Sequence, residues 1–441
     1  MSNHIKNQKS ILQKLGIEQL NPMQQEAQFH IHSKSEIVLL SPTGTGKTLA
    51  FLLPLMAELD TAVEGVQALV LAPSRELAIQ IEQVAREMGT GFKINSAYGG
   101  RPFSKDKMNL KHPPALLIGT PGRVADHLRR QTFSTEQIRF LVLDEFDKSL
   151  EVGFEEEMAA IVESIGTVEK KILTSATQEV VIPEFVGLEN PISIDYLAEG
   201  VAQLDIKILL SPTKDKLEIL VEALLRLGNQ SGIVFCNFKD SIQRVSAYLS
   251  AQNIAHACFY GGMEQKDRER SLLKFRNGTH QLLLATDLAA RGIDVPEIKF
   301  IIHYHLPHRS QEFTHRNGRT ARMHQDGTAY VLHWKKETLP DFIQEVNVER
   351  CQVRDLPQTE FSLNSKWSTL MLSGGRRDKI SKGDIAGFFF KQGNLQKEEL
   401  GRIELKQDCA FAAVPTPKVK QLIKKLDGQR VKKRKVKVVE V

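Results

Sequence analysis

The sequence contains little cysteine and no long apolar run. Its four cysteines, Cys236, Cys258, Cys351 and Cys409, are scattered over 441 residues, and no two form a CxxC pair. This spacing argues against a disulfide framework or a zinc site and favours a reducing compartment. No apolar stretch approaches the roughly 20 residues that span a bilayer, and the polar N-terminus lacks the apolar segment of a secretory signal. We therefore expect a cytoplasmic protein.

The net charge is only +6, but it is unevenly distributed. Residues 366–441 contain 19 Lys and Arg against 8 Asp and Glu, a net charge of +11. The first 365 residues hold the other 40 basic (59 − 19) and 45 acidic (53 − 8) residues, a net charge of −5. A basic segment attached to an acidic body indicates a polyanionic partner for that segment. Charge alone leaves a merely solvated surface as the alternative.

Short apolar runs alternate with helical patterns in two successive series. At this length two or three domains are expected. The first series has runs at 36–40, 68–71, 115–118, 140–143 and 171–173; the second has runs at 206–210, 232–236, 256–259, 281–285, 300–303 and 328–332. Such alternation is typical of parallel sheets with helical crossovers. We expect an α/β fold with two tandem lobes, residues 1–198 and 199–345.

The last part of the chain has a different pattern. Periodicity is lost over residues 346–365, which indicates a connector, and residues 366–441 then form a separate unit. Strand-like runs at 369–372, 401–405, 411–414 and 434–439 surround helical patterns at 382–389 and 417–426. This order predicts a small α+β domain of the RNA-recognition type. The basic run 432–437 also resembles a localisation signal, but we interpret it as a final strand with one basic face.

Residues 41–48 (SPTGTGKT) lie between an expected strand and an expected helix. Glycine permits the tight backbone that turns N–H groups towards phosphates, and the following helix N-terminus adds its positive dipole end. In such a loop Lys47 reaches the β- and γ-phosphates and Thr48 ligates Mg²⁺. The strict phosphate-loop pattern has glycine where this chain has Ser41. The segment predicts a nucleotide-binding loop.

A second nucleotide-site signal is an apolar strand, 140–143, that ends in the carboxylates Asp144 and Glu145. Carboxylates at the carboxyl end of a buried strand complete a phosphate-loop site. Asp144 is expected to hold Mg²⁺, and Glu145 to orient or deprotonate the attacking water. An acidic pair is often a solvated surface, but its position after an apolar strand favours the catalytic interpretation.

Further motifs stand in one order along residues 16–326, and with them the chain resembles the DEAD-box RNA helicases of helicase superfamily 2. The matching segments are 16–24, 41–48, 73–78, 99–100, 120–123, 144–147, 175–177, 233–237, 265–268, 285–294 and 315–322. The resemblance implies two RecA-like lobes, ATP and Mg²⁺ as cofactors, RNA as partner and an RNA-stimulated ATPase. It also implies that ATP and RNA each favour closure of the two lobes.

The resemblance assigns roles to individual residues. ATP contacts are implied for Gln24, Ser41, Thr43, Gly44, Thr45, Gly46, Lys47, Thr48 and Asp294. Catalytic roles are implied for Lys47, Asp144, Glu145, Arg319 and Arg322, and coupling roles for Asp147, Ser175, Thr177 and His315. RNA contacts are implied for Arg75, Gly99, Gly100, Thr120, Gly122, Arg123, Gln265, Arg268 and Thr286. The two arginines of segment 315–322 are implied to act on the γ-phosphate.

Two positions depart from the family pattern. Phe146 stands where the family has alanine, and Asn7 stands where the family has an aromatic residue that stacks on the base. We expect Phe146 to fill an apolar gap, because the carboxylates Asp144, Glu145 and Asp147 are retained. An ATP-gated RNA clamp without hydrolysis and a DNA-directed helicase remain the alternatives.

Residues 369–441 resemble the RNA-binding domain of DbpA-type helicases. The resemblance rests on residues 372–379 (LSGGRRDK), 383–385 (GDI) and 411–415 (FAAVP). It implies RNA contacts from Arg376, Arg377 and Lys379, whereas Phe411 is the one aromatic residue in a plausible stacking position. It further implies ribosomal RNA as target, in large-subunit assembly, with a pre-ribosomal particle as possible partner and a monomeric protein.

Overall fold

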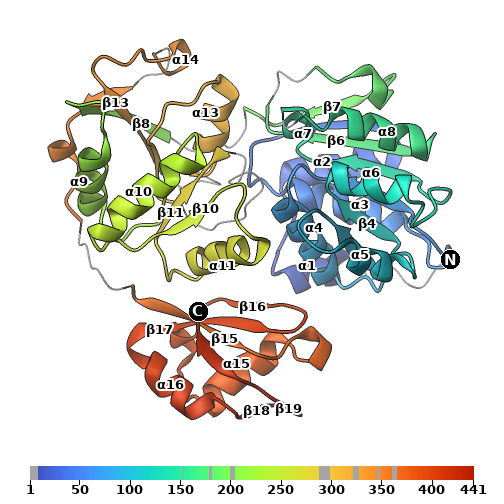
Figure 1. Cartoon of the computed structure of the whole chain (residues 1–441). Coiled ribbons are helices and arrows are strands. Elements are labelled where there is room, and N and C mark those ends of the chain that lie inside the picture. Colours follow the sequence, from blue (N-terminus) through green and yellow to red (C-terminus); the bar gives the residue numbers. More distant parts are fainter. Residues whose placement is uncertain are drawn as a thin grey trace. The chain divides into compact units, whose positions relative to one another are not determined.

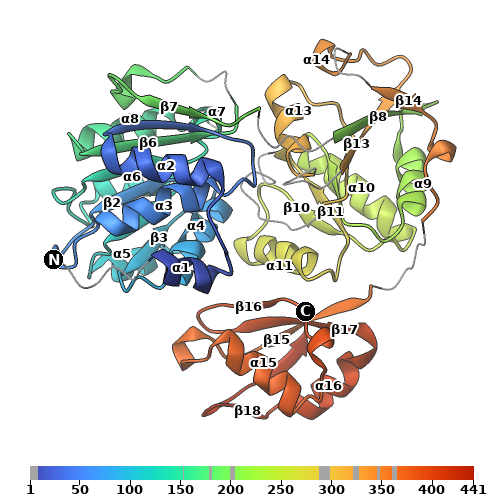
Figure 2. The same ribbon diagram turned by 180° about the vertical axis from the view of Figure 1, so that it is seen from behind.

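The computed structural model describes residues 8–151, 153–177, 181–198, 204–287, 298–320, 327–344, 348–359 and 365–441. The chain forms two compact units. The first is built on Met1–Gln203, here called lobe 1; the second contains Leu204–Ala290, Val295–Thr320 and Asp326–Val441. The second unit comprises lobe 2 and the C-terminal module (Figures 1 and 2). Within the described ranges, no helix combines the length and apolar character needed to cross a membrane.

Lobe 1 is a seven-stranded parallel sheet in the order β3-β4-β2-β5-β6-β1-β7. The strands are β1 (Glu36–Leu40), β2 (Ala68–Leu71), β3 (Ile94–Ala97), β4 (Leu116–Gly119), β5 (Phe140–Leu143), β6 (Lys170–Ser175) and β7 (Ile192–Asp195). The helices are α1 (Gln8–Leu15), α2 (Pro22–Ser33), α3 (Lys47–Glu58), α4 (Arg75–Glu87), α5 (Phe103–Leu110), α6 (Pro121–Arg129), α7 (Phe146–Glu151) and α8 (Glu155–Ile165). The parallel sheet is confirmed, and β3 and β7 are strands that the sequence did not predict.

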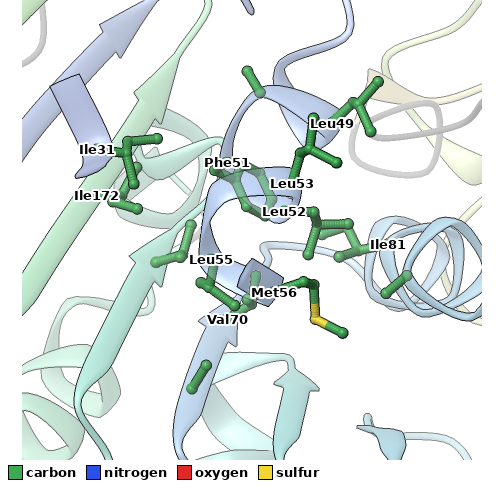
Figure 3. Packing of buried hydrophobic residues seen from close by; sticks show 14 of the residues in the cluster. Ile31, Leu49, Phe51, Leu52, Leu53, Leu55, Met56, Val70, Ile81 and Ile172 are labelled. Carbon is green, nitrogen blue, oxygen red and sulfur yellow. The ribbon is translucent and has the colours of Figure 1, made fainter. Parts of the chain in front are cut away.

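Two apolar clusters cover the two faces of this sheet. Side chains alternate between faces along each strand, so Val70 of β2 joins one cluster and Leu71 joins the other. The first cluster is centred on α3, which is buried on almost every side (Figure 3). Phe51 of α3 lies among Ile31 of α2 and Ile172 of β6. Packing on all sides fixes the helix whose first residue is Lys47.

Lobe 2 repeats this architecture with a parallel sheet in the order β10-β11-β9-β12-β13-β8-β14. Its strands are β8 (Leu204–Ser211), β9 (Gly232–Phe235), β10 (Ala257–Phe259), β11 (Leu282–Ala285), β12 (Phe300–His303), β13 (Gly327–Trp334) and β14 (Glu349–Cys351). Its helices are α9 (Leu217–Leu227), α10 (Lys239–Ala251), α11 (Gln265–Arg276), α13 (Ser310–Asn317) and α14 (Asp341–Gln344).

The prediction that residues 346–365 form a connector is wrong for the first half of this segment. Strand β14 pairs with β8, and Cys351, Val353 and Leu356 are buried in the core of lobe 2. The segment has no clear periodicity because a three-residue edge strand and a short turn are too brief to show one. Lobe 2 therefore extends to about Leu356.

The C-terminal module is an antiparallel sheet in the order β16-β17-β15-β20 with two helices. Its elements are β15 (Trp367–Leu372), the 3₁₀ turn η3 (Arg376–Asp378), α15 (Lys382–Lys391), β16 (Ile403–Leu405), β17 (Ala410–Pro415), α16 (Val419–Leu426), β18 (Arg430–Val431), β19 (Arg434–Lys435) and β20 (Val438–Glu440). Apolar side chains of α15 and α16 pack on one face of this sheet. The predicted small α+β domain is confirmed.

The single final strand expected over 434–439 is wrong. The chain instead forms a hairpin of β18 and β19, followed by β20, which pairs with β15. Lys432 begins the hairpin turn with φ of +54°, a conformation that the alternating sequence does not reveal. Val436 and Val438 both enter the core, so their spacing imitates a continuous strand. The basic residues therefore gather around a hairpin.

Candidate functional site

The candidate nucleotide-site residues meet at the carboxyl edge of the lobe 1 sheet. Parallel strands all end at the same edge, and β6 lies between β5 and β1. The loop 41–46 follows β1, Asp144 follows β5, and Ser175 ends β6. The backbone N–H of Ser41 donates to the carbonyl of Ser175 at 3.1 Å. The sheet thus brings together three segments that are far apart in the sequence, since Ser41 and Ser175 are separated by 134 positions (175 − 41).

The loop before α3 is organised around the amine of Lys47. Gly44 and Gly46 have φ of +86° and +89°, values that favour glycine. The hydroxyl of Ser41 hydrogen-bonds that of Thr45 at 2.7 Å. The Lys47 amine donates to the carbonyls of Ser41 and Pro42, and burial lowers the pKa of Lys47 to about 8. A buried amine inside a ring of backbone groups suits a phosphate.

Asp144 and Glu145 are both buried beside this loop. The Thr174 hydroxyl donates to Asp144 Oδ1 at 2.5 Å and accepts from the backbone N–H of Glu145 at 3.1 Å. Glu145 has φ of +46°, a strained conformation of the kind found at functional sites. Its carboxylate pairs with the amine of Lys148 at 2.9 Å. Burial and the charge of Glu145 raise the pKa of Asp144 to about 6.

This concentration of buried carboxylates fits Mg²⁺ held together with phosphate oxygens. The raised pKa of Asp144 means that its negative charge lacks sufficient compensation from the protein. Thr48, the second residue of α3, has the hydroxyl expected as the other ligand. Over the residues that the structure describes, no group of three or more His, Cys, Asp or Glu could hold a metal. Mg²⁺ in nucleotide sites uses one or two protein ligands, so this donor set is sufficient.

Gln24 lies directly on the nucleotide loop. Its side-chain amide donates to the Gly46 carbonyl at 3.2 Å, and a Cβ on Gly46 would lie 2.4 Å from the same nitrogen. Asn21, which sequence reasoning missed, caps α2 and donates to the Thr45 carbonyl at 2.9 Å. Its reciprocal capping bonds with Gln24 could have been read from the sequence pattern Asn-Pro-x-Gln. Asn7 lies outside the described residues.

The predicted coupling residues of lobe 1 form a hydrogen-bonded link. The Thr177 hydroxyl donates to Asp147 Oδ2 at 3.2 Å, and the Ser175 hydroxyl donates to the Thr177 carbonyl at 2.8 Å. The carbonyl of Ser175 also accepts a hydrogen bond from the backbone N–H of Ser41, so the link reaches the nucleotide loop. Phe146 points away from it, buried at 2% exposure in the second apolar cluster. The phenylalanine therefore fills apolar space.

The RNA-contact candidates of lobe 1 follow the other strands of the same edge. Arg75 packs on Gly99 and Gly100, where a Cβ on Gly100 would lie 2.2 Å from the guanidinium. Thr120 and Gly122 stand at the start of α6. Arg123 is tied to the buried carboxylate of Asp106 at 2.9 Å, and Arg101 pairs with the same carboxylate. Sequence reasoning missed Asp106, because it belongs to none of the motif segments.

In lobe 2 the side chain of Arg316, in segment 315–322, has several charged and polar partners, although sequence reasoning did not single it out. Its guanidinium binds both oxygens of Asp287 at 2.6 Å and donates to Asn237 Oδ1 at 2.8 Å. His315 and Arg319, which are close to Arg316 in the sequence, are also buried. Asp294 and Arg322 lie outside the described residues. Arg316 thus joins three of the motif segments into one framework.

The remaining RNA-contact candidates are distributed over lobe 2 and the C-terminal module. Gln265 begins α11, Thr286 follows β11, and the Arg268 guanidinium lies 4.7 Å from the centre of the Phe259 ring. In the module, Arg376, Arg377 and Lys379 lie on or beside η3. The backbone N–H of Arg377 donates to the Gln407 carbonyl at 2.8 Å, which fixes this turn against the loop after β16.

Three family models match successive parts of the chain. The DEAD/DEAH box helicase model matches residues 21–184, and the helicase conserved C-terminal domain matches residues 215–324. The DbpA RNA binding domain matches residues 369–440. These segments coincide with lobe 1, lobe 2 and the C-terminal module.

Curated relatives and solved structures agree with these matches. ATP-dependent RNA helicase DbpA of Escherichia coli K12 is 29% identical and covers 96% of this chain and 94% of its own length. DEAD-box ATP-dependent RNA helicase CshA of Bacillus cereus is 32% identical over 79% of this chain and 67% of its own length. Dbp5 of S. cerevisiae, solved bound to RNA and ADP BeF3, is 23% identical with a TM-score of 0.70 over 78% of this chain and 94% of that chain, which shows the same RecA-like fold. With its phosphate loop, paired carboxylates and DbpA-type module, the chain belongs to the DEAD-box ATP-dependent RNA helicases.

Proposed function

We propose that this helicase uses Mg²⁺ and ATP to remodel structured ribosomal RNA during large-subunit assembly in the cytoplasm. The observation that carries the nucleotide half of the proposal is the grouping of Lys47, Asp144 and Glu145 at one sheet edge. The RNA half is supported by the match to the DbpA RNA binding domain over residues 369–440.

Lobe 1 supplies the groups that hold and activate the nucleotide. Lys47 contacts the β- and γ-phosphates, and Glu145 orients or deprotonates the attacking water. Thr48 and Asp144 hold Mg²⁺, which neutralises phosphate charge when bound. The strained backbone at Glu145 and its ion pair with Lys148 keep the Glu145 carboxylate in position. Gln24 and Asn21 link the adenine side of the site to the same loop.

Lobe 2 supplies the positive charge that the transferred phosphoryl group requires. Arg319 and Arg322 act on the γ-phosphate, since guanidinium groups present rigidly forked donors. An arginine in this role is worth roughly 10³–10⁵ in rate. Asp294 contacts the ribose, and His315 couples the two ligands. ATP and RNA each raise the affinity for the other, because both favour the same state of the protein.

RNA is gripped through its backbone by lobes 1 and 2, without reading of sequence. Target selection falls to the C-terminal module, whose net charge of +11 over residues 366–441 suits a phosphate-rich ligand. The buried position of Phe146 supports hydrolysis over the alternative of a non-hydrolysing clamp, since the substitution leaves the carboxylates in place. The protein acts as a monomer.

The decisive experiment measures ATP hydrolysis with a large-subunit ribosomal RNA, bulk RNA and DNA at one stated salt concentration. Ribosomal RNA is expected to give half-maximal stimulation at the lowest concentration, bulk RNA at a higher one, and DNA no stimulation. Lys47→Ala should abolish hydrolysis with all three while the fold survives. Equal stimulation by all three nucleic acids would contradict the ribosomal target, and hydrolysis by Lys47→Ala would contradict the assigned site.

A further inference from the structure

Phe238 is an exposed aromatic residue at the carboxyl edge of the lobe 2 sheet. It follows strand β9, stands at the N-cap of α10 and is 61% exposed. Among the residues that the structure describes, the other exposed phenylalanines, Phe29 and Phe390, lie within helices α2 and α15. Phe238 instead stands at the edge where parallel sheets present their ligand-binding loops.

Two properties of Phe238 are unfavourable for folding. The N-cap side chain of a helix usually accepts a hydrogen bond from the first turn, a role that serine, threonine, asparagine and aspartate fill. Phe238 makes no such bond to α10. Its ring also leaves apolar surface in water, which costs free energy. Two departures from what stability favours, at one position beside a candidate site, indicate that the residue serves a function.

The backbone at Phe238 is held in place through the preceding residue, Asn237. The Asn237 side chain accepts a hydrogen bond from the Arg316 guanidinium at 2.8 Å and donates one to the Leu306 carbonyl at 2.9 Å. Its backbone N–H donates to Nδ1 of His305 at 3.3 Å. Burial lowers the pKa of His305 to about 4, so the imidazole is neutral at pH 7 and one nitrogen can accept. Phe238 is therefore anchored by the framework around Arg316, while its ring faces solvent.

The Phe238 ring has aromatic neighbours on one side. Its centre lies 6.4 Å from the centre of the His305 ring, which lies 4.9 Å from that of Tyr304. Both of these residues follow β12, the strand next to β9 in the sheet. Aromatic rings at such distances attract one another. The His305 ring therefore supports the Phe238 ring, and the exposed surface of Phe238 remains available to a ligand.

Phe238 lies beside the segments that carry the RNA-contact candidates of lobe 2. The sheet order places β9 next to β11 and β11 next to β10, and neighbouring strands are about 4.8 Å apart. Thr286 follows β11, and Gln265 begins the helix after β10. The backbone N–H of Cys236 donates to the Ala285 carbonyl at 3.0 Å, which joins the two strand ends just before Phe238 and Thr286. An RNA strand on Thr286 would therefore pass within reach of the Phe238 ring.

The surroundings of the ring are polar. The loops after β9 and β12 meet where the Asn237 side-chain nitrogen lies 2.9 Å from Nε2 of His308. The exposed residues next to Phe238 and in the loop after β12 are Lys239, Asp240, His308 and Arg309. A protein partner would need a broader apolar patch around an aromatic anchor. A single ring among polar groups, two of them basic, instead suits a nucleic acid, whose base stacks while its phosphates meet the cations.

We infer that Phe238 is a stacking site for one base of the bound RNA strand. This inference rests on the proposed RNA-binding function, and it adds a contact with a base to contacts that are otherwise made to the backbone. Every base has a flat face, so stacking tolerates any sequence, but the larger purines stack more strongly than the pyrimidines. Inside a duplex both faces of a base are covered by its neighbours. Phe238 therefore favours single strands and holds one strand after the duplex has opened.

Affinity for single-stranded RNA tests the stacking site in the full chain. Fluorescence anisotropy measures the binding of labelled oligoadenylate and oligouridylate, with Mg²⁺, a non-hydrolysable ATP analogue and one fixed salt concentration. Phe238→Leu keeps an apolar side chain but removes the ring, and should weaken oligoadenylate binding at least about fivefold and oligouridylate binding less. Phe238→Trp should retain both affinities. The matched control, Phe29→Leu, removes an exposed ring from α2 and should change neither affinity more than about twofold.

A tryptophan at the same position detects the base directly. A base stacked on the indole quenches its fluorescence, so saturating oligoadenylate should lower the emission of Phe238→Trp more than that of Phe29→Trp or of the unsubstituted chain, which contains two tryptophans. Circular dichroism checks that each variant is folded. Unchanged RNA affinity in Phe238→Leu, an equal loss for both RNAs, or no additional quenching in Phe238→Trp that binds RNA would overturn the stacking site and leave the proposed function standing. Absence of RNA binding by the unsubstituted chain would overturn both.

Discussion

The two lobes share one architecture, but they differ in how charged side chains at the carboxyl edges of their sheets are compensated. In lobe 1, burial and Glu145 raise the pKa of Asp144 to about 6, and burial lowers the pKa of Lys47 to about 8. In lobe 2, Arg316 has both oxygens of Asp287 as partners and also reaches Asn237. Burial and the charge of Arg316 lower the pKa of His303 to about 3, so His303 is neutral.

The difference separates a binding edge from a supporting edge. A shifted pKa reports a charge that the protein alone does not stabilise, and a ligand of opposite charge can stabilise it. The carboxylates of lobe 1 have this character, whereas the Arg316–Asp287 pair of lobe 2 is satisfied internally. Removing a charged group from this edge should therefore destabilise lobe 2 and stabilise lobe 1.

The largest effect is expected for Arg316→Leu. The substitution leaves Asp287 and Asn237 without the guanidinium, and breaking a buried ion pair in this way destabilises by about 3–5 kcal/mol. The change in the free energy of unfolding is measured by urea denaturation, monitored with a probe placed in lobe 2. The matched control is Arg244→Leu, which breaks an equally short but exposed pair with Asp215 and should cost less than about 1 kcal/mol. Equal losses of unfolding free energy in the two variants would contradict the structural role assigned to the Arg316–Asp287 pair.

A smaller effect of opposite sign is expected for Asp144→Asn. A shift from 3.8 to about 6 corresponds to at most about 3 kcal/mol, so the nucleotide-free protein should become more stable while hydrolysis is lost. Because the folded protein holds this proton more tightly, its stability should fall as pH rises from about 4 to 6, and the variant should lack that component. Thermal unfolding across this range measures it, with the surface substitution Asp126→Asn as control. An unchanged pH profile would contradict the assignment.

The smallest effect is expected for Thr177→Val, which removes one hydrogen bond to Asp147 worth about 1 kcal/mol. Basal hydrolysis should change less than tenfold, while the stimulation by RNA should fall more, because the link between Asp147 and the nucleotide loop is broken. Thr135→Val, at a surface hydroxyl of the same lobe, should change neither quantity. Equal loss of basal and stimulated rates would show that the link does not couple RNA to the site.

The sequence predicted the nucleotide edge because its chemistry lies in continuous segments. Strands at 36–40, 68–71 and 140–143 were predicted with their observed bounds, since parallel strands covered on both faces are nearly continuous apolar runs. The polar residues of the site follow these strands directly. Family resemblance then supplied roles for them, and the comparisons confirm the family.

What the sequence could not reveal depends on contacts between distant segments. Nothing local distinguishes Asp106 from other helix acids until Arg101 and Arg123 are seen beside it. Likewise Asn277 and Thr369 are 92 residues apart, and neither carries a pattern that predicts the hydrogen bond between their side chains. Strand β3 (INSA) was missed because two polar residues interrupt a buried strand at the sheet's edge.

Under the proposed role of Gln24 in reading the base, its hydrogen bond to the Gly46 carbonyl makes that recognition an exchange of partners. A purine that takes the Gln24 amide has to displace a carbonyl that stands immediately before Lys47. Binding of the correct base to Gln24 would therefore free the Gly46 carbonyl. This carbonyl belongs to the loop that surrounds the phosphates at the other end of the nucleotide. The proposed role of Gln24 therefore predicts that the loop 41–46 is less restrained once the base is bound.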